Sequence, residues 1–271
     1  MPSPSPAAAK PPPPPPPQLR PQPRPSPSPL LPLALMLLLG LALSAAPARA
    51  ERTFDSGPQR VALIELFTSQ GCNSCPPAER WLGELRGDPR LWRELVPVAF
   101  HVDYWDGLGW RDQFASPAFS QRQRQYYREG AVGTVYTPGF VVDGREWRGW
   151  FRAGDLPAPR PAAGRLRLGV DGVDVAARFD GAAAGETLQL HLAVLGVGIR
   201  AEIGAGENSG RTLGQDFTVL GHRVLAAADG RWSGQLPTFA APAGARLALA
   251  AWVSRDGLQA PLQAVGGWLP D

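Results

Sequence analysis

Lysine is almost absent from this chain: Lys10 is the only one among 271 residues, and every other basic residue is arginine. The first 50 residues hold four of the 27 basic residues and no acid, which leaves 23 basic against 24 acidic residues in the remainder. No stretch after residue 50 concentrates positive charge, as a nucleic-acid-binding face requires. We therefore expect no nucleic-acid partner.

Cysteine and histidine are scarce as well. Cys72 and Cys75 are the only cysteines, and none of the three histidines stands at a spacing that would pair it with another metal ligand. A structural zinc site needs four such ligands. We expect neither a metal site nor another cofactor.

The first 50 residues differ from the rest of the chain. Residues 1–29 are mostly Pro, Ser and Ala, a composition that cannot build a core. An uncharged apolar run follows at 30–46, and the small-residue pattern "ARA" after it is one that a signal peptidase recognises. We interpret residues 1–50 as a Pro-rich n-region and signal peptide and expect an exported protein, periplasmic or extracellular. An uncleaved leader, which would anchor the protein in a membrane, stays open as an alternative.

Hydrophobic patterning from residue 61 predicts alternating strands and helices. The run "VALIELF" at 61–67 is typical of a buried parallel strand, and the Val- and aromatic-rich run at 95–105 of a second. Between them, apolar residues recur at helical spacing from about Pro77, and Pro76 should hold Cys75 outside that helix.

Capping and turn residues predict the next two elements. Ser116 can cap a helix that has Pro117 in its first turn and Gly130 at its end. An Asp143-Gly144 turn then predicts a β-hairpin. The order strand, helix, strand, helix, hairpin indicates a thioredoxin-like α/β domain with a mixed sheet, βαβαββ, which we assign to residues 51–157.

A proline-rich break at 156–164 precedes a different texture. Residues 158–271 contain alternating apolar and polar runs separated by Gly-rich turns, and no long helix pattern. Such a pattern predicts an all-β, sandwich-like module that follows the α/β domain.

The spacing C-x-x-C between a strand and a helix is typical of thiol–disulfide exchange. In that chemistry one exposed thiolate attacks a substrate disulfide and the second cysteine resolves the mixed intermediate. Cys72 is the candidate nucleophile, in an exposed position, and Cys75 the candidate resolver. A structural disulfide is the alternative.

Pro138 is the second candidate site residue, because it stands where a strand enters and directly before the predicted hairpin. Thioredoxin-like folds hold a cis proline at such a position, opposite the cysteine loop, so we expect a cis bond at Pro138. The backbone of Thr137 would then be free to pair with an extended substrate. An ordinary trans proline at a strand start is the alternative.

An acid and an aromatic cluster complete the candidate site. Glu65, the one charge in the first strand, resembles the buried acid that relays a proton to the resolving cysteine in thioredoxins; a salt-bridged glutamate is the alternative. At the end of the second strand, side chains that could form a substrate-binding lip gather: Asp103, Tyr104, Trp105 and Trp110.

Four segments together resemble the bacterial domain-of-unknown-function family 1223: "LFTSQGCNSCPPAERWLGEL", "HVDYWDGLGWRDQFASPAFSQRQRQYY", "VYTPGFVVDGR" and "IGAGENSGRT". The resemblance covers nearly all of residues 61–260. It implies a secreted protein with a thioredoxin-like fold that carries Cys72, Cys75 and Pro138, and with an appended β-rich part. It implies no substrate.

Two functions compete. One is an exported thiol–disulfide oxidoreductase, with a disulfide-containing protein or peptide as substrate and a second redox protein as partner. The other is a secreted, non-catalytic binding protein in which the two cysteines form a structural disulfide. Metal delivery is disfavoured, since the sequence has no methionine cluster and no paired histidines near the cysteines.

Overall fold

The structure is a computed structural model. It describes residue 14 and residues 51–270, apart from 153, 159, 160, 162 and 163. The predicted signal peptide and part of the predicted proline-rich break lie outside the described residues. The described residues from Glu51 on form one compact unit. Among the described residues, no helix is both long and apolar enough to span a bilayer.

The protein is a mixed α/β structure in which strands dominate. Four strands form the part of the sheet from which the cysteine loop extends. β2 (Ala62–Thr68) and β3 (Leu95–His101) run parallel and in register. β4 (Gly139–Val142) pairs antiparallel with β2, and β5 (Arg145–Glu146) pairs with β4. The second strand is shorter than the predicted run 95–105, because β2, the strand it pairs with, ends at Thr68 opposite His101.

Two helices flank these strands. α2 (Pro76–Glu84) follows β2, and α3 (Pro117–Arg128) follows β3. The hydroxyl of Ser116 accepts the N–H of Ala118, which is the predicted cap of α3. Three short 3-10 turns complete this part: η1 (Leu85–Gly87), η2 (Asp103–Trp105) and η3 (Gly149–Arg152). The predicted order of strand, helix, strand, helix and hairpin is confirmed.

The large sheet does not end at the α/β part. Its strand order is β14-β13-β8-β11-β3-β2-β4-β5, which adds four strands from the C-terminal half: β8 (Leu188–Val197), β11 (Thr218–Ala227), β13 (Arg246–Arg255) and β14 (Pro261–Trp268). The junction is the start of β11, where Thr218 pairs with Ala99 of β3 and the N–H of Ala99 donates to the carbonyl of Phe217 at 2.8 Å.

The β-rich part does not stand as a separate module after the α/β part, because β11, β8, β13 and β14 continue the sheet of β3. Without β11, the N–H of Ala99 on the outer edge of β3 would lack a strand partner, and the carbonyl of Phe217 supplies one. Periodicity predicts strands but does not say which edge they cover.

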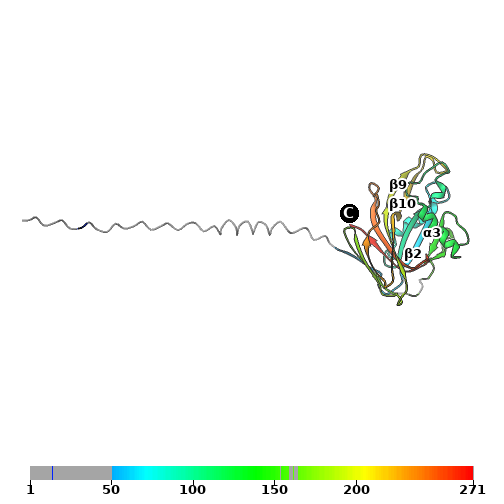
Figure 1. Ribbon diagram of the computed structural model, residues 1–271. Coiled ribbons are helices and arrows are strands. Elements are labelled where there is room, and N and C mark those ends of the chain that lie inside the picture. The colour runs from blue at the N-terminus through cyan, green and yellow to red at the C-terminus, as the bar shows by residue number, and fades with distance from the viewer. Residues whose placement is uncertain (1–13, 15–50, 153, 159–160, 162–163, 271) are drawn as a thin grey trace, which may run out of the picture. The chain divides into compact units, whose positions relative to one another are not determined.

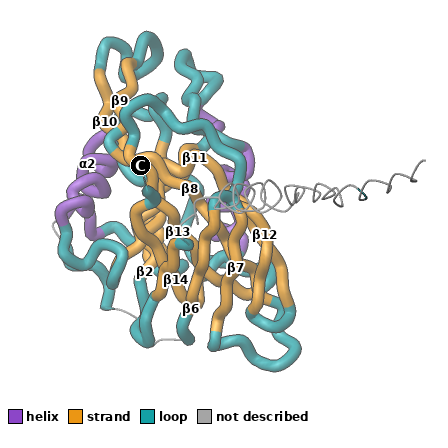
Figure 2. The backbone as a smooth tube through the Cα atoms, turned by 90° about the vertical axis from the view of Figure 1, so that its left-hand side faces the viewer, coloured by secondary structure: helices purple, strands orange, loops and turns teal. Residues whose placement is uncertain are grey.

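A second sheet packs against this extension. Its order is β1-β6-β7-β12, and all its pairs are antiparallel: β1 (Arg52–Asp55), β6 (Leu166–Asp171), β7 (Asp174–Phe179) and β12 (Arg231–Gln235). Figure 2 shows β6, β7 and β12 side by side. Burial alternates along β6 and β7, as in sheets with one wet face. Their inward side chains share one apolar cluster with β8, β13 and β14, so two sheets do pack face to face.

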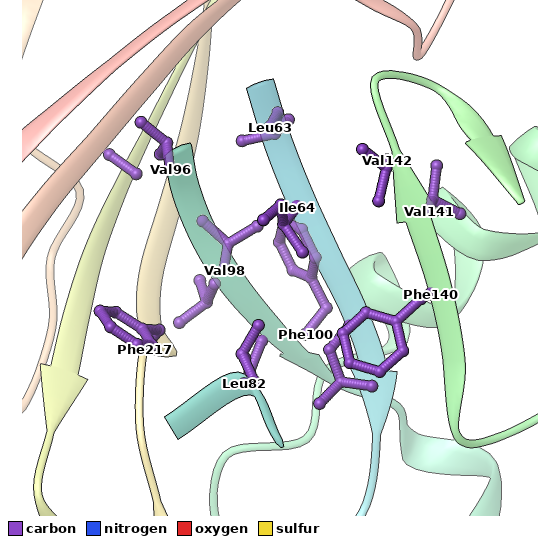
Figure 3. Close-up of a cluster of buried hydrophobic side chains, with 14 of the residues drawn as sticks. Leu63, Ile64, Leu82, Val96, Val98, Phe100, Phe140, Val141, Val142 and Phe217 are labelled. Atoms are coloured by element: carbon purple, nitrogen blue, oxygen red, sulfur yellow. The ribbon is translucent and has the colours of Figure 1, made fainter. Parts of the chain in front are cut away.

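The core around β2 and β3 is apolar on both faces. Every residue of these two strands is buried, and Phe100 and Phe140 lie in the cluster that Figure 3 shows. Burial of each such large side chain contributes about 1.5–3 kcal/mol. This packing holds the end of β2, where the cysteine loop begins, in one place.

Strand alternation decides which helix each β2 residue meets. Successive side chains point to opposite faces. The ring of Phe67 lies 6.3 Å from that of Tyr126 on α3, whereas Thr68 donates a hydrogen bond to Glu79 on α2. Odd-numbered residues of β2 therefore face α3, and even-numbered ones face α2.

A small hairpin stands apart from both sheets. β9 (Ile199–Glu202) and β10 (Thr212–Gln215) pair antiparallel at one end of the compact unit (Figure 1). The nine residues that join these strands, 203–211, are called the covering loop below. Its base packs against Trp110 through Ala201, Ile203 and Leu213.

Candidate functional site

The cysteine loop, residues 69–75, joins β2 to α2. Cys72 and Cys75 form a disulfide with 5.5 Å between their Cα atoms. Cys75 is the N-cap residue of α2, and its carbonyl accepts the N–H groups of Ala78 and Glu79 at 2.9 and 3.1 Å. Its backbone is helical, with φ −77° and ψ −35°. Cys75 thus lies outside the regular helix, as expected, and its backbone is helical despite the steric preference before proline because these two hydrogen bonds favour it.

Both cysteines are fully buried, with an exposed fraction of 0 %. Cys72 was expected to be exposed, and the structure contradicts this. The cause lies far along the chain: the covering loop reaches over the cysteine loop. This contact is tertiary, and local patterns around Cys72 contain no sign of it.

Asn208 fastens the covering loop to the cysteine loop. Its side-chain amide donates to the carbonyls of Gln70 and Cys72 at 2.9 and 3.0 Å, and Asn208 itself is 0 % exposed. Glu207 adds a third contact, since its carboxylate accepts the N–H of Asn73 at 3.2 Å. These polar bonds satisfy cysteine-loop groups that would otherwise be buried without partners.

Trp110 braces the same contact from the side. Its indole N–H donates to Gln70 Oε1 at 2.8 Å, and the amide of Gln70 donates to Gln215 at the end of β10. Gly206 lies against it with φ +73°, and a Cβ there would come within 3.0 Å of the Trp110 Cβ. Gly206, the second glycine of the segment "GAGENSG", is needed for both the turn and this close approach. Trp110 thus supports the covering loop as well as the cysteine loop.

Trp105 connects the cysteine loop to the predicted proline. A Cβ on Gly71 would lie 3.3 Å from the Trp105 Cβ, and the Trp105 indole N–H donates to Thr137 Oγ1 at 2.8 Å. The bond between Thr137 and Pro138 is cis, as predicted. Beside it, a cavity of about 380 Å³ is lined by mostly apolar groups: Thr134, Tyr136, Pro138, Arg148, Trp150 and Phe151.

Asp103 and Tyr104 point to α3 and not to the cysteines. Asp103 accepts a hydrogen bond from the Ser120 hydroxyl, and the Tyr104 hydroxyl donates to Gln123 Oε1 at 3.1 Å. Burial raises the pKa of Tyr104 to about 12. Of the predicted aromatic lip, the structure brings Trp105 and Trp110 to the cysteine loop and uses the other two to hold α3.

Glu65 is buried, but it does not lie with the cysteines. It accepts hydrogen bonds from Arg122, at 2.6 Å, and from the Tyr126 hydroxyl, both on α3. Glu65 is on the odd-numbered face of β2, and α2 covers the even-numbered face. The salt-bridged alternative describes its surroundings.

A different acid, Glu79, occupies the place expected of Glu65. Glu79 lies one helical turn after Cys75, is 6 % exposed, and accepts the Thr68 hydroxyl at 2.8 Å. Burial raises its pKa to about 7, against the opposing effects of the nearby His101 charge and the Thr68 hydrogen bond. A carboxyl with that pKa can exchange a proton near neutral pH.

An ion pair lies next to this acid. His101 ends β3 opposite Thr68 and so shares its face, and His101 Nδ1 is 2.6 Å from Asp112 Oδ2. Burial alone would lower the pKa of His101, but the Asp112 carboxylate raises it overall. In turn burial would raise the pKa of Asp112, and the His101 cation together with the N–H of Gln70 lowers it. A charged pair is thereby held beside Glu79.

Sequence reasoning missed Glu79, His101, Asp112 and Asn208. The sequence could have indicated Glu79, because it stands four residues after Cys75 and residues i and i+4 share a helix face. Nothing local marks the other three, which become neighbours only through the tertiary fold. Among the described residues, no group of three His, Cys, Asp or Glu side chains could hold a metal ion.

Two solved structures match the chain. It is similar to the X-ray crystal structure of Protein AGR_C_4864 from Agrobacterium tumefaciens, with 23 % identity, a TM-score of 0.54, and coverage of 77 % of this chain and 94 % of that one. HBP35 of Porphyromonas gingivalis is 19 % identical, with a TM-score of 0.48 and coverage of 78 % and 76 %. No curated protein matches. The family model described as protein of unknown function (DUF1223) matches residues 63–254. Since that is well over half of the chain, the protein belongs to the DUF1223 family.

Proposed function

We propose that this protein is an exported thiol–disulfide oxidoreductase with a thioredoxin-like fold, which acts on protein or small-molecule disulfides through Cys72 and Cys75. The observation that carries the proposal is the disulfide at the junction of β2 and α2, one helical turn from a buried acid whose pKa is about 7. A structural staple has no use for such an acid.

The exchange begins from the reduced protein. The Cys72 thiolate attacks one sulfur of the substrate disulfide, and the substrate S–S bond breaks as the mixed disulfide forms. Glu79, as a carboxylate, takes the proton of Cys75, whose sulfur then attacks Cys72 and releases the second substrate thiol. The substrate gains two electrons and the cysteine pair loses them. A dithiol donor restores the reduced pair, and the same steps in reverse oxidise a substrate dithiol.

Access to the disulfide requires movement of the covering loop. Attack on a disulfide needs a line of approach to one sulfur, and both cysteines are buried beneath residues held by Asn208. The covering loop is tied to the cysteine loop by three hydrogen bonds, so opening costs less than unfolding the core. The proposed enzyme is therefore gated.

The predicted signal peptide at residues 1–50 supports the proposed export of the protein. A signal peptide would deliver the chain to a compartment where disulfides persist. There, a disulfide-containing protein or peptide is the proposed substrate, and a separate thiol protein is the proposed redox partner.

A non-catalytic binding protein with a structural disulfide is the second candidate. The observation that favours it is the complete burial of both cysteines. The two functions differ in the reduction potential of the pair, since structural disulfides have potentials below about −300 mV.

Trapping in the native host tests the proposal. Cys75→Ala leaves the Cys72 thiol without its resolver, so mixed disulfides with substrates should accumulate and be identified by mass spectrometry under non-reducing conditions. Cys72→Ala is the matched control and should trap nothing. A potential below about −300 mV together with an empty trap would establish the structural disulfide instead.

A further inference from the structure

A second, polar cavity lies on the other face of the sheet. It has a volume of about 500 Å³ and opens between α3, β8, β11 and the turn after β13. Most of its lining side chains carry nitrogen, among them Gln121, Arg122, Arg128, Gln189, His191 and His222. Its volume lies within the range of small-molecule sites.

Arg122 forms the inner wall of this cavity. It is 6 % exposed, and its Nε donates to Glu65 at 2.6 Å. Its terminal nitrogens donate to the Tyr126 hydroxyl and to Gln259, and the guanidinium lies 5.1 Å from the ring centroid of Trp252. These contacts fix the guanidinium in place. Each of its two terminal nitrogens keeps one N–H group that these hydrogen bonds do not use.

Two histidines form the wall next to it. His191 Nδ1 lies 3.3 Å from His222 Nε2, and His191 Nε2 lies 3.0 Å from Ser254 Oγ. Burial and the nearby Arg122 charge lower the pKa of His222 to about 3 and hold that of His191 well below its usual value, so both rings are neutral at pH 7. Within the described residues His222 Nδ1 has no hydrogen bond, although its ring lines the cavity.

The charge of the cavity wall has one sign. Its charged lining residues are Arg122 and Arg128. Glu65 neutralises Arg122 from behind and is fully buried. Glu129 lies beside the cavity, where its carboxylate accepts hydrogen bonds from the Gln125 amide and from the N–H of Gln259 and helps to raise the pKa of Arg122. Arg128 bonds only the neutral oxygen of Gln125 among the described residues. Both charged side chains that line the cavity are thus arginines, together with neutral donors, and neither Glu65 nor Glu129 lines it.

We propose that this cavity binds a small organic monocarboxylate. Its carboxylate would accept hydrogen bonds from the imidazole of His222 and from Arg122, with Arg128 at the rim supplying the balancing charge. A planar carboxylate presents two acceptor oxygens, which match the remaining N–H groups of Arg122 and the imidazole of His222. The aliphatic part of the ligand would lie along Ala118, Phe119 and Val224.

A purely structural role for Arg122 and the two histidines explains only part of how they are arranged around the cavity. The pair of Arg122 and Glu65 alone ties α3 to β2, and burying further polar groups beside it costs free energy unless they are used. An unpaired His222 nitrogen on a cavity adds nothing to that tie.

Titration with butyrate tests the proposal, with butyramide as the uncharged analogue of the same shape. Butyrate should saturate the full-length protein with a dissociation constant on the order of 1 mM and shift the imidazole resonances of His222, whereas butyramide should bind at least about tenfold more weakly. His222→Gln should weaken butyrate binding about fivefold. Arg128→Gln should weaken it about threefold.

Arg124→Gln is the matched control, because Arg124 is exposed on the same helix and does not line the cavity. It should leave butyrate binding unchanged. Arg128 is also exposed, so its variant reports on the cavity even if His222→Gln does not fold. Binding of inorganic phosphate alone, equal binding of butyramide, or no saturable binding overturns the proposal.

Discussion

Asn208→Ala should open the gate over the disulfide. Asn208 donates two hydrogen bonds to backbone carbonyls of the cysteine loop, at 2.9 and 3.0 Å, and it is fully buried. A typical hydrogen bond contributes about 1 kcal/mol net, so the closed state should lose about 2 kcal/mol. Because about 1.4 kcal/mol corresponds to a factor of ten, the open fraction should rise about 30-fold.

The assay is the rate at which dithiothreitol reduces the disulfide under native conditions. If the loop opens and closes quickly compared with reduction, this rate is proportional to the open fraction and should also rise about 30-fold. Ser209→Ala is the control, because Ser209 is exposed and its hydroxyl bonds only Gly204 within the covering loop. Its rate should stay within about twofold of that of the unchanged protein.

One outcome would refute this reasoning. If Asn208→Ala lowers the free energy of unfolding in urea but leaves the reduction rate unchanged, the covering loop does not limit access to the sulfurs. A reduction rate that follows global stability across unrelated variants would point to whole-molecule unfolding as the route of access.

Two further predictions concern the groups near the cysteines. The folded protein keeps a proton on Glu79 up to a pH of about 7, while the unfolded chain releases it near the ordinary glutamate pKa of 4.5. The free energy of unfolding should thus fall by about 3 kcal/mol as the pH rises from 4.5 to about 7. In urea denaturation, the Glu79→Gln variant should not show this fall. If the variant's free energy of unfolding falls with pH as before, Glu79 is not the group that titrates. Trp105→Phe removes the hydrogen bond from the indole N–H to Thr137 and should lower the free energy of unfolding in urea by about 1 kcal/mol. An unchanged free energy of unfolding would mean that a hydrogen bond to water replaces it.

The elements around the cysteines were predictable because each has a local cause. An unbroken apolar run makes β2 a buried strand, Ser116 and Pro117 start α3, and the Asp143-Gly144 turn closes the hairpin. The disulfide between Cys72 and Cys75 follows from a spacing of three residues. Each of these features depends on residues close together in the chain.

The acid was misassigned for a reason that can be named. Glu65 and Glu79 are both near the cysteines in sequence, but a strand sends alternate residues to opposite faces, and only the position of α2 tells which face counts. With α2 on the Thr68 face, Glu79 meets the site and Glu65 meets Arg122.

By itself the sequence determined the alternation of strands and helices, the cysteine pair and the cis proline at position 138, because short-range sterics, hydrophobic period and turn chemistry suffice for those. Only the tertiary structure decided that β11 joins the edge of β3 and that Asn208 lies over Cys72. Contacts between residues 136 positions apart depend on how whole sheets pack, and no local pattern encodes that packing.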